Sequence, residues 1–316
     1  MNFRHLRAFA AIADAGGFAR AAARVHLSQP ALSRQIRALE EELGVPLFDR
    51  IGRRVQLTSE GEDLLRRSRR LLAEAESLGE RARSLKGGQT GILRVGATPQ
   101  VIENLLSSFL TRYRARHPGV EVHLVEDGGV RLAARLERGD VHLALAQADA
   151  RFQTRLLYPM HVLAVLSPKR RLGRRAVLEI AELADEPLLL LRRDFASREW
   201  FDAACQAAHI HPRALLESAA PHTLLALAAT DYGIAIVPSN ARIPRRTVRA
   251  VPLVHRGASI GRWATVFWDP QRFRAPYAEQ FVEEIVTFCR RDYPGRGLIG
   301  RAPALPRPKL NLAQAA

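Results

Sequence analysis

The stretch that follows Ser28 carries side chains able to form paired hydrogen bonds with the edges of nucleic-acid bases. Apolar residues recur there every three or four positions, which predicts an amphipathic helix over residues 29–43, with Ser28 as its cap and Gly44 at its end. The polar face of that helix would present a short group of contact residues. We predict that Gln29, Ser33 and Arg34 read bases and that Pro30 makes an apolar contact.

Two shorter helical patterns precede this helix, over residues 3–15 and 18–24, and Gly16-Gly17 separates them. Two short helices joined by a tight turn, the second with polar and basic residues near its start, form the helix-turn-helix plan, whose second helix enters the major groove of DNA. The alternative is a three-helix bundle with a polar face that only contacts solvent. The pattern favours DNA binding over that alternative.

A small hairpin is predicted over residues 46–58, with Gly52 in its turn. A basic hairpin beside a helix-turn-helix forms a wing, which can reach backbone phosphates or the minor groove. We therefore assign phosphate or minor-groove contacts to four arginines: Arg37, Arg50, Arg53 and Arg54.

The charge of the chain agrees with a polyanionic partner without proving one. The 316 residues include 48 Lys+Arg and 32 Asp+Glu, for a formal net charge of +16. A balance this basic points to nucleic acid or to a membrane surface. The alternative is a preference for arginine in a GC-rich genome, which the small number of lysines supports, since the only ones are Lys86, Lys169 and Lys309.

A long helix is predicted from residue 59 to about residue 86. Its apolar positions alternate in steps of four and three, which is the spacing of a seam for a second helix. We predict a homodimer through this seam, and the alternative is a helix packed on its own domain. The proposed dimer residues are Leu64, Leu71, Ala75, Leu78, Ala82 and Leu85.

Strands and helices alternate in the rest of the chain, after a glycine-rich break at residues 87–91. Strands are predicted over residues 92–97, 120–125 and 141–146, with helices over 102–116 and 132–138 between them. The alternation resumes after residue 187, with strands over 188–191, 214–218, 234–237 and 266–268 and helices over 198–208, 223–230 and 276–291. This order is typical of parallel α/β sheets and suggests two lobes with a cleft between them.

Ligands of open α/β sheets bind beyond the carboxyl ends of the strands, where helices begin. Five residues at such positions are the candidate effector site: Thr98, Gln147, Ser197, Arg198 and Thr223. Helix N-termini and an arginine favour a carboxylate-bearing metabolite. The alternative is that the three hydroxyl residues are only helix caps and that Arg198 is a surface charge.

Residues 1–90 closely resemble the N-terminal domain of LysR-type transcriptional regulators. The resemblance is carried by SQPALS at residues 28–33, Gln35-Ile36, Leu43-Gly44, Leu47-Phe48 and Leu57-Thr58 with Gly61. Segments such as GILRVGATP and TLLALAATDYGIAIVP extend it, less specifically, to about residue 291. The resemblance implies an α+β multidomain protein with a winged helix-turn-helix, a dimerising linker helix and a periplasmic-binding-protein-like effector domain.

These observations together divide the chain. The expected DNA-binding domain is residues 1–58, the linker helix 59–88 and the effector domain 91–291. The resemblance places one lobe at about 91–160 and 262–291, places the other at about 161–261, and joins the lobes by two crossovers. Residues 292–316 are rich in arginine and proline and are expected to be disordered.

The partners and location follow from the same features. We expect double-stranded DNA with a pseudo-palindromic site, a small-molecule effector and a homodimer. The resemblance further implies a homotetramer, and RNA polymerase is a candidate partner. No apolar run is long enough to span a membrane, and no secretory signal is evident. We therefore expect a cytoplasmic location and no membrane association.

Enzyme chemistry finds little support in the sequence. There is no dinucleotide or P-loop motif and no nucleophile elbow, so we expect no enzyme activity and no cofactor. The acidic pair Glu126-Asp127 lacks a catalytic partner. Metal binding is not expected, because His209 and His211 would point to different faces of a helix and the two cysteines are not in a C-x-x-C arrangement. Two alternatives remain: a binding-fold enzyme fused to a DNA-binding domain, and an architectural DNA-binding dimer without an effector.

Overall fold

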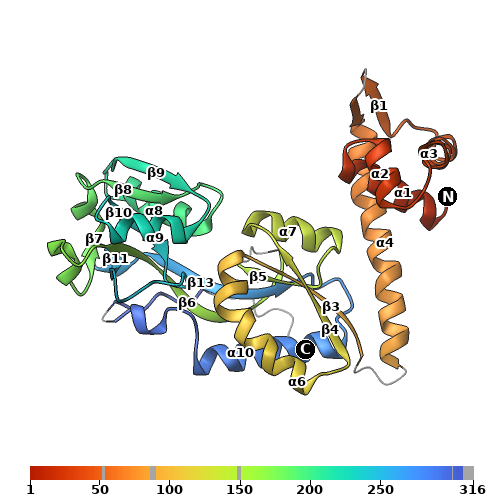
Figure 1. Cartoon of the computed structure of the whole chain (residues 1–316). Helices are drawn as coiled ribbons and strands as arrows, with labels where there is room; N and C mark the ends of the chain where they lie inside the picture. The colour runs from red at the N-terminus through yellow and green to blue at the C-terminus, as the bar shows by residue number, and fades with distance from the viewer. Residues whose placement is uncertain (52–53, 86–89, 148–150, 301, 309–316) are drawn as a thin grey trace. The chain divides into compact units, whose positions relative to one another are not determined.

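The structure is a computed structural model of the chain, and it describes residues 1–51, 54–85, 90–147, 151–300 and 302–308. The chain divides into two compact units (Figure 1). The first is formed mainly by residues 1–87, and the second by most of the chain from residue 88 onward. Each unit has a hydrophobic core of its own.

The first unit begins with three helices, α1 (Phe3–Ala15), α2 (Phe18–Arg24) and α3 (Gln29–Leu43), which confirms the predicted bounds. Their ends are set by local chemistry. The Ser28 side chain accepts a hydrogen bond from the backbone of Ala31, and Gly44 ends α3 with a φ of 72°. The helices bury one face each around a common core that includes Leu6, Phe9, Ile12, Leu32, Ile36 and Leu39.

The predicted hairpin is present as β1 (Phe48–Ile51) and β2 (Arg54–Leu57), and it is tied to α3 at its base. The carboxylate of Glu40 accepts hydrogen bonds from the backbone N–H groups of Leu47, at 2.8 Å, and Phe48, at 3.3 Å. The end of α3 therefore fixes where the hairpin begins.

The long helix α4 (Ser59–Leu85) is attached to the hairpin by Thr58. The Thr58 hydroxyl donates to the carbonyl of Pro46 at 2.7 Å and accepts from the N–H of Gly61 at 2.8 Å. A Cβ at Gly61 would lie 2.2 Å from the carbonyl oxygen of Leu47, so this position requires glycine. Figure 1 shows α1–α3 gathered along the first part of α4, with its later part extending beyond them.

One mixed sheet organises the second unit, with the strand order β4-β3-β5-β13-β6-β10-β8-β9. In the first lobe, β3 (Gly91–Ala97) pairs in parallel with β4 (Val120–Glu126) and with β5 (Leu143–Ala146). Helices α6 (Ser107–Arg116) and α10 (Pro276–Arg291) share one core with these strands, and α7 (Gly129–Arg138) belongs to a second, smaller core.

The helix expected over residues 102–116 starts earlier and is not regular. It begins with the short α5 (Pro99–Val101), continues as the π-helical turn η1 (Ile102–Leu106) and then becomes α6. Pro99 fits the first position of the helix, where its missing N–H costs no hydrogen bond.

Two strands pass from one lobe to the other, as the family resemblance implied. They are β6 (Gln153–Leu166) and β13 (Gly261–Trp268), and they pair antiparallel from Gln153 to His161. The sequence pattern predicted no strand between residues 147 and 187. That prediction is wrong, because β6 lies in this interval. Pro159 lies within β6, and a proline inside an apolar run argues against a central strand.

The second lobe contains β8 (Leu188–Leu191), β9 (Ala214–Ser218) and β10 (Ile234–Pro238), with β8 parallel to both neighbours. The strand β11 (Arg249–His255), also absent from the sequence-based prediction, pairs with β6 and with the two-residue strands β7 (Leu178–Glu179) and β12 (Ala258–Ser259). Helices α8 (Ala196–Ala207) and α9 (Pro221–Ala229) belong to two separate cores, so both faces of β8 are covered.

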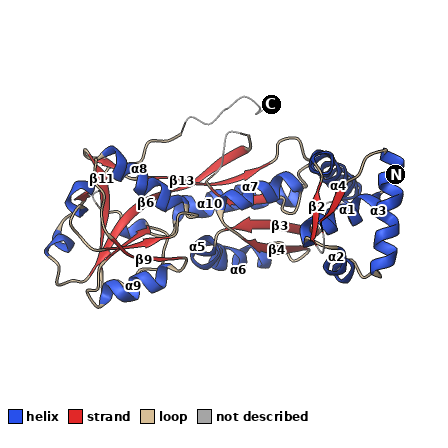
Figure 2. Cartoon of the chain, turned by 90° about the horizontal axis from the view of Figure 1, so that it is seen from above, coloured by secondary structure: helices blue, strands red, loops and turns tan. Residues whose placement is uncertain are grey.

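The single-turn helices η2 (Arg171–Arg174) and η3 (Ile180–Leu183) lie in the connection between β6 and β8. Figure 2 shows the helices flanking the strands of each lobe.

The residues after α10 differ from the expectation of a disordered tail. Within the described part, residues 296–298 form the short helix η4 (Arg296–Leu298), and Leu305 is buried with 5% of its surface exposed. The expectation of disorder from residue 292 is therefore wrong for residues 292–300 and 302–308. The arginine- and proline-rich composition of this segment did not reveal that Leu298 packs against the core that contains α9, or that Leu305 packs against Gly261 of β13.

Candidate DNA-binding surface and effector site

The outward side of α3 presents a recognition face, by which we mean Gln29, Pro30, Ser33, Arg34 and Arg37. Gln29, Pro30, Arg34 and Arg37 are exposed, and Ser33 is half-buried. Among the described residues, neither Arg34 nor Arg37 has an ion-pair partner within 4.0 Å. Both guanidinium groups are thus available to an outside partner.

The hairpin arginines are described only in part. Arg50 lies in β1 and pairs with Val55, and Arg54 lies in β2 and pairs with Ile51. Their side chains, and Arg53 as a whole, lie outside the described residues. Two exposed arginines of α1, Arg4 and Arg7, add positive charge to this unit and were not singled out from the sequence. They could have been found by their position on the polar face of the first helix.

Helix α4 exposes large apolar side chains along the predicted seam. Leu71 and Leu78 are 48% and 72% exposed. Ala82 is exposed, Leu64 and Ala75 are half-buried, and the side chain of Leu85 lies outside the described residues. Two exposed leucines seven residues apart on one helix are typical of a surface that another helix covers.

The candidate effector residues of the first lobe lie at the ends of neighbouring strands. Thr98 follows β3 directly, and Gln147 follows β5 directly. Because Ala97 of β3 pairs with Leu145 of β5, both residues leave the sheet at the same edge. The structure therefore brings Thr98 and Gln147 together at the carboxyl ends of parallel strands.

Ser197 and Thr223 occupy the corresponding position in the second lobe. Ser197 is the second residue of α8, which follows β8, and Thr223 is the third residue of α9, which follows β9. The residues that precede these helices are Phe195 and Ala220, and neither helix has a side-chain cap. Thr98 precedes α5 but its hydroxyl does not cap that helix. The alternative that these three hydroxyl residues are only caps does not hold.

A hydrogen bond links the strand ends of the two lobes. The indole N–H of Trp200, on α8, donates to Oε1 of Gln147 at 2.9 Å. In addition, a Cβ at Gly128 would lie 4.0 Å from the carbonyl oxygen of Asp194. The loops after β4, β5 and β8 thus face one another. Trp200 is a contact that the sequence analysis missed, since nothing in the sequence pairs residue 200 with residue 147.

Arg198 does not play the role that the sequence suggested. Its side chain is 5% exposed and is held by Asp202 at 2.7 Å, by Glu217 at 2.9 Å and by the carbonyl of Leu191 at 2.6 Å. Two carboxylates already balance its charge, so it is neither a surface charge nor a free ligand for a carboxylate. It connects the start of α8 to β8 and β9.

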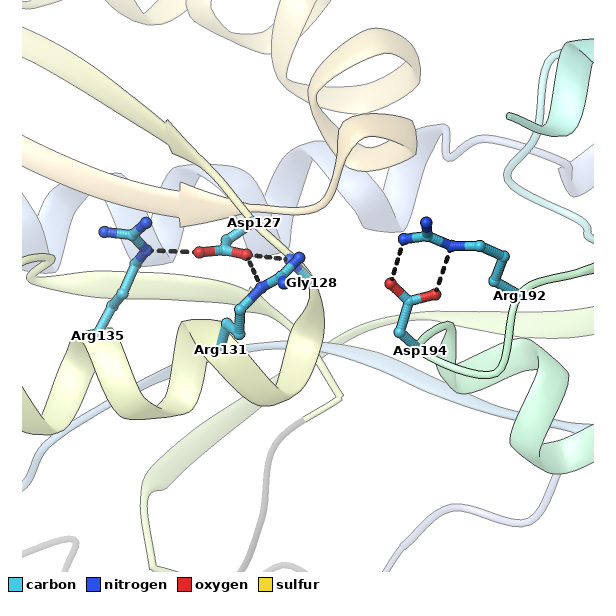
Figure 3. A network of polar contacts seen from close by, with 6 residues as sticks. All are labelled: Asp127, Gly128, Arg131, Arg135, Arg192 and Asp194. Atoms are coloured by element: carbon cyan, nitrogen blue, oxygen red, sulfur yellow. Dashed lines mark hydrogen bonds and ion pairs between the residues drawn. The ribbon is translucent and has the colours of Figure 1, made fainter. Parts of the chain in front are cut away.

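The loops at this edge carry two further arginine–carboxylate networks (Figure 3). Asp127 accepts hydrogen bonds from the N–H of Gly128 at 2.9 Å, from Arg135 at 2.7 Å and from Arg131. Although burial opposes it, these donors hold the pKa of Asp127 below its usual range. Within the acidic pair Glu126-Asp127, Asp127 thus has arginine partners, and these contacts hold the loop and the start of α7.

Asp194 is similarly paired with Arg192, whose Nη2 lies 2.7 Å from its Oδ2. This hydrogen bond, with a contribution from the charge of Arg131, holds the pKa of Asp194 below its usual range. Each of these two carboxylates is therefore ionised and neutralised by an arginine. Neither leaves an unpaired negative charge at the strand ends that would repel an anion.

Metal binding and membrane insertion find no support in the described residues. No group of three or more His, Cys, Asp or Glu there could hold a metal ion. Within the same part of the chain, no helix combines the length and apolarity needed to cross a membrane. Cys205 and Cys289 are free and buried, and burial raises the pKa of each thiol to about 12.

A winged helix-turn-helix followed by a two-lobed α/β domain defines a ligand-responsive regulator of transcription. Residues 3–62 match the family described as "Bacterial regulatory helix-turn-helix protein, lysR family", and residues 86–290 match the family described as "LysR substrate binding domain". The chain belongs to the LysR family of bacterial transcriptional regulators, and the DNA-binding and effector-binding halves expected from the resemblance are confirmed.

Named relatives agree with this assignment. The chain is 34% identical over 263 residues to the HTH-type transcriptional regulator IlvR of Caulobacter vibrioides, a match that covers 80% of this chain and 88% of that protein. Full-length CbnR in complex with its target DNA has a TM-score of 0.60 and 26% identity, and the match covers 90% of this chain and 99% of that chain. A full-length OxyR variant from Pseudomonas aeruginosa shares the fold, with a TM-score of 0.69, 23% identity and coverage of 98% and 99%.

The buried thiols lead to a prediction about reactivity. Because the thiolate is the reactive form and burial raises both pKa values to about 12, Cys205 and Cys289 should be almost fully protonated at neutral pH. We expect Ellman's reagent to modify them only as fast as the protein unfolds. An Arg114→Cys variant, at an exposed position of α6, is the control that should react at once. Rapid reaction of either native thiol in the folded protein would contradict this prediction.

Proposed function

We propose that the chain is a homodimeric regulator that reads a pseudo-palindromic operator through α3 and responds to a carboxylate-bearing metabolite held between its two lobes. The observation that carries the proposal is the meeting of strand and helix ends from both lobes at Gln147 and Trp200. We further propose that it acts in the cytoplasm and without enzyme activity. The proposed division is a DNA-binding domain at residues 1–58, a linker helix at 59–88 and an effector domain at 91–291.

The recognition face supports the DNA-reading role. In this proposal Gln29, Ser33 and Arg34 contact base edges and Pro30 makes an apolar contact, since residues near the start of a recognition helix lie deepest in the major groove. Arg37 lies one turn further along, where phosphates are within reach. Arg50, Arg53 and Arg54 hold phosphates or the minor groove from the hairpin, which Glu40 fixes relative to α3.

The roles of Arg34 and Arg37 can be separated by measurement on operators selected from random-sequence DNA. Arg34→Ala should cost about 1–3 kcal/mol of binding free energy and relax the preference at one base pair, because a paired base contact is lost. Arg37→Ala should weaken all sequences alike and lower the salt slope by about 1, because one phosphate contact is lost. Arg114→Ala, an exposed arginine outside the DNA-binding unit, is the control. An Arg34→Ala protein with unchanged affinity and base preference would refute the base-reading role.

The exposed leucines of α4 support the dimer. Side chains that are 48% and 72% exposed at Leu71 and Leu78 leave apolar surface in water, and a second α4 would remove it. A symmetric pair of α3 helices then fits two half-sites about one helical turn apart, or a multiple of that. A tetramer, as a dimer of such dimers, is the assembly that the family resemblance adds.

Assembly through α4 is tested by charge. Leu71→Asp and Leu78→Asp should each shift the protein toward the monomer in light scattering at micromolar concentration, because a buried aspartate would be placed in the seam. Arg70→Asp, at an adjacent exposed position of the same helix, should leave the mass unchanged. A parent protein that is monomeric under these conditions, or leucine variants that remain dimers, would show that α4 is not the contact.

The proposed effector site combines hydroxyl groups with helix N-termini. Thr98 and Thr223 do not cap helices and are half-buried and exposed, respectively, so their hydroxyls are available to a ligand, and Gln147 is within the same loop cluster. Ser197 is buried at the start of α8 and would line the site from behind. Helix N-termini favour an anion through their free N–H groups. Arg198 supports this site by holding the start of α8 in place, not by contacting the carboxylate.

A thermal-shift screen of small organic acids on the full chain tests the site. A ligand at about 100 times its Kd should add about 2.7 kcal/mol to the free energy of unfolding, and its amide counterpart should add much less. Thr98→Val and Thr223→Val should reduce the shift, while Thr111→Val, on the exposed side of α6, should not. Equal stabilisation of all three variants would place the effector elsewhere, and better binding of the amides would exclude the carboxylate.

A further inference from the structure

The segment after α10 is in contact with both lobes of the second unit. We call residues 293–300 and 302–308 the C-terminal strap. The first-lobe contact is made by Tyr293, whose ring stacks on Tyr158 of β6 with the centroids 5.4 Å apart and the planes 12° from parallel. Tyr158 is part of the core of the first lobe.

The next residues of the strap contact the second lobe. Gly295 has a φ of +87°, and a Cβ there would lie 2.0 Å from the carbonyl oxygen of Ser239, just after β10. Arg245 donates a hydrogen bond to the carbonyl of Gly297, and Leu298 packs against the core that contains α9. Only glycine permits this approach at residue 295.

The last part of the strap returns to the strands that connect the lobes. The hydroxyl of Ser259 donates to the carbonyl of Pro303 at 2.6 Å. Leu305 is buried against Gly261 of β13, where an added Cβ would lie 3.0 Å from its Cδ1 atom. The guanidinium of Arg307 lies 5.6 Å from the ring centroid of Trp263, also on β13.

The surface beneath the strap is the region where the chain passes between the lobes. His161 of β6 is 2% exposed. Its backbone carbonyl accepts a hydrogen bond from the N–H of Ser239 at 2.8 Å, and its own N–H donates to the Ser239 hydroxyl at 3.1 Å. Burial lowers the pKa of His161, against a smaller opposite effect of the Pro303 backbone, which favours the neutral ring at this position. Next to it, the carbonyl of Asn240 accepts a hydrogen bond at 2.9 Å from Asn104 of the first lobe.

We propose that the C-terminal strap holds the two lobes at a fixed opening and thereby sets the resting state of the effector site. The inference rests on the proposed function, because it assumes that the effector binds between the lobes. A change in their relative orientation would strain the contacts of Tyr293 or Leu298, since these half-buried residues pack against the cores of different lobes. The strap therefore biases the equilibrium between open and closed lobes.

A distance measurement tests the strap without any ligand. Spin labels at Arg114→Cys, in the first lobe, and His211→Cys, in the second, report the separation of the lobes by pulsed electron resonance. The native thiols are buried, and the parent without added cysteines shows the background labelling. The doubly labelled chain is diluted in an excess of unlabelled parent, so that distances between labels in different subunits do not contribute. We expect one narrow distance distribution for the full chain and an added population at a changed distance in Leu305→Asp, in Gly295→Ala and in a chain that ends at Asp292.

Gly300→Ala is the matched control for Gly295→Ala. Both glycines have positive φ, but a Cβ at Gly300 meets no atom within 4 Å, whereas at Gly295 it meets backbone. The control should keep the distance distribution of the parent. Where truncation is not tolerated, Gly295→Ala still tests the contact, because it removes no buried side chain.

Each outcome decides the proposal. Changed distances in the strap variants and unchanged distances in Gly300→Ala support it. Strap variants that lower the melting temperature but keep the parent distances would show that the segment only stabilises the second lobe, and the proposal would be wrong. The acid screen is independent of this result, so failure to find a carboxylate ligand would count against the proposed effector and not against the strap.

Discussion

The antiparallel pairing of β6 with β13 is the constraint on which the second unit depends. These two strands carry the chain into and out of the second lobe, and they pair from Gln153 to His161 with an irregularity at Ala264/Thr265. Because β6 continues into the second lobe and pairs there with β10 and β11, the two cores share one hydrogen-bonded frame. The strand ends that form the candidate effector site face one another only because this frame is shared.

The elements that could be predicted from the sequence are those specified by their own residues. The bounds of α3 follow from Ser28, from the helical spacing of its apolar side chains and from Gly44. By contrast, β6 was missed because its apolar run has no clear period and includes Pro159. Arg198 was assigned from its place after β8, but its role is decided partly by Glu217, on a neighbouring strand that no local pattern links to it. An ion pair between residues that are distant in the sequence, such as Arg198 and Glu217, cannot be predicted from the spacing of residues along the chain.

The arginine-rich composition has a structural explanation as well as a functional one. Arg20 donates to the carbonyl of Ala15 at 2.7 Å, Arg170 is held by Glu186 at 2.6 Å and by Asp231 at 2.5 Å, and Arg198 is enclosed by two carboxylates. The total of 48 Lys+Arg therefore overstates the number of cations that are free to contact DNA. The informative arginines are those that the fold leaves exposed and unengaged on a polar helix face, and they could not be separated from the others by counting.

Different residues of α3 hold the hairpin, fill the core and face outward, and Glu40 is the one that holds the hairpin. The wing is anchored at residue 40, beyond the recognition face, and the core is filled by Leu32, Ile36 and Leu39 on the opposite side. Exchanges among the outward residues between 29 and 37 thus leave both the anchor and the core in place. With the base-reading role proposed for this face, operator preference can change by surface substitution alone, while the placement of the hairpin is inherited unchanged.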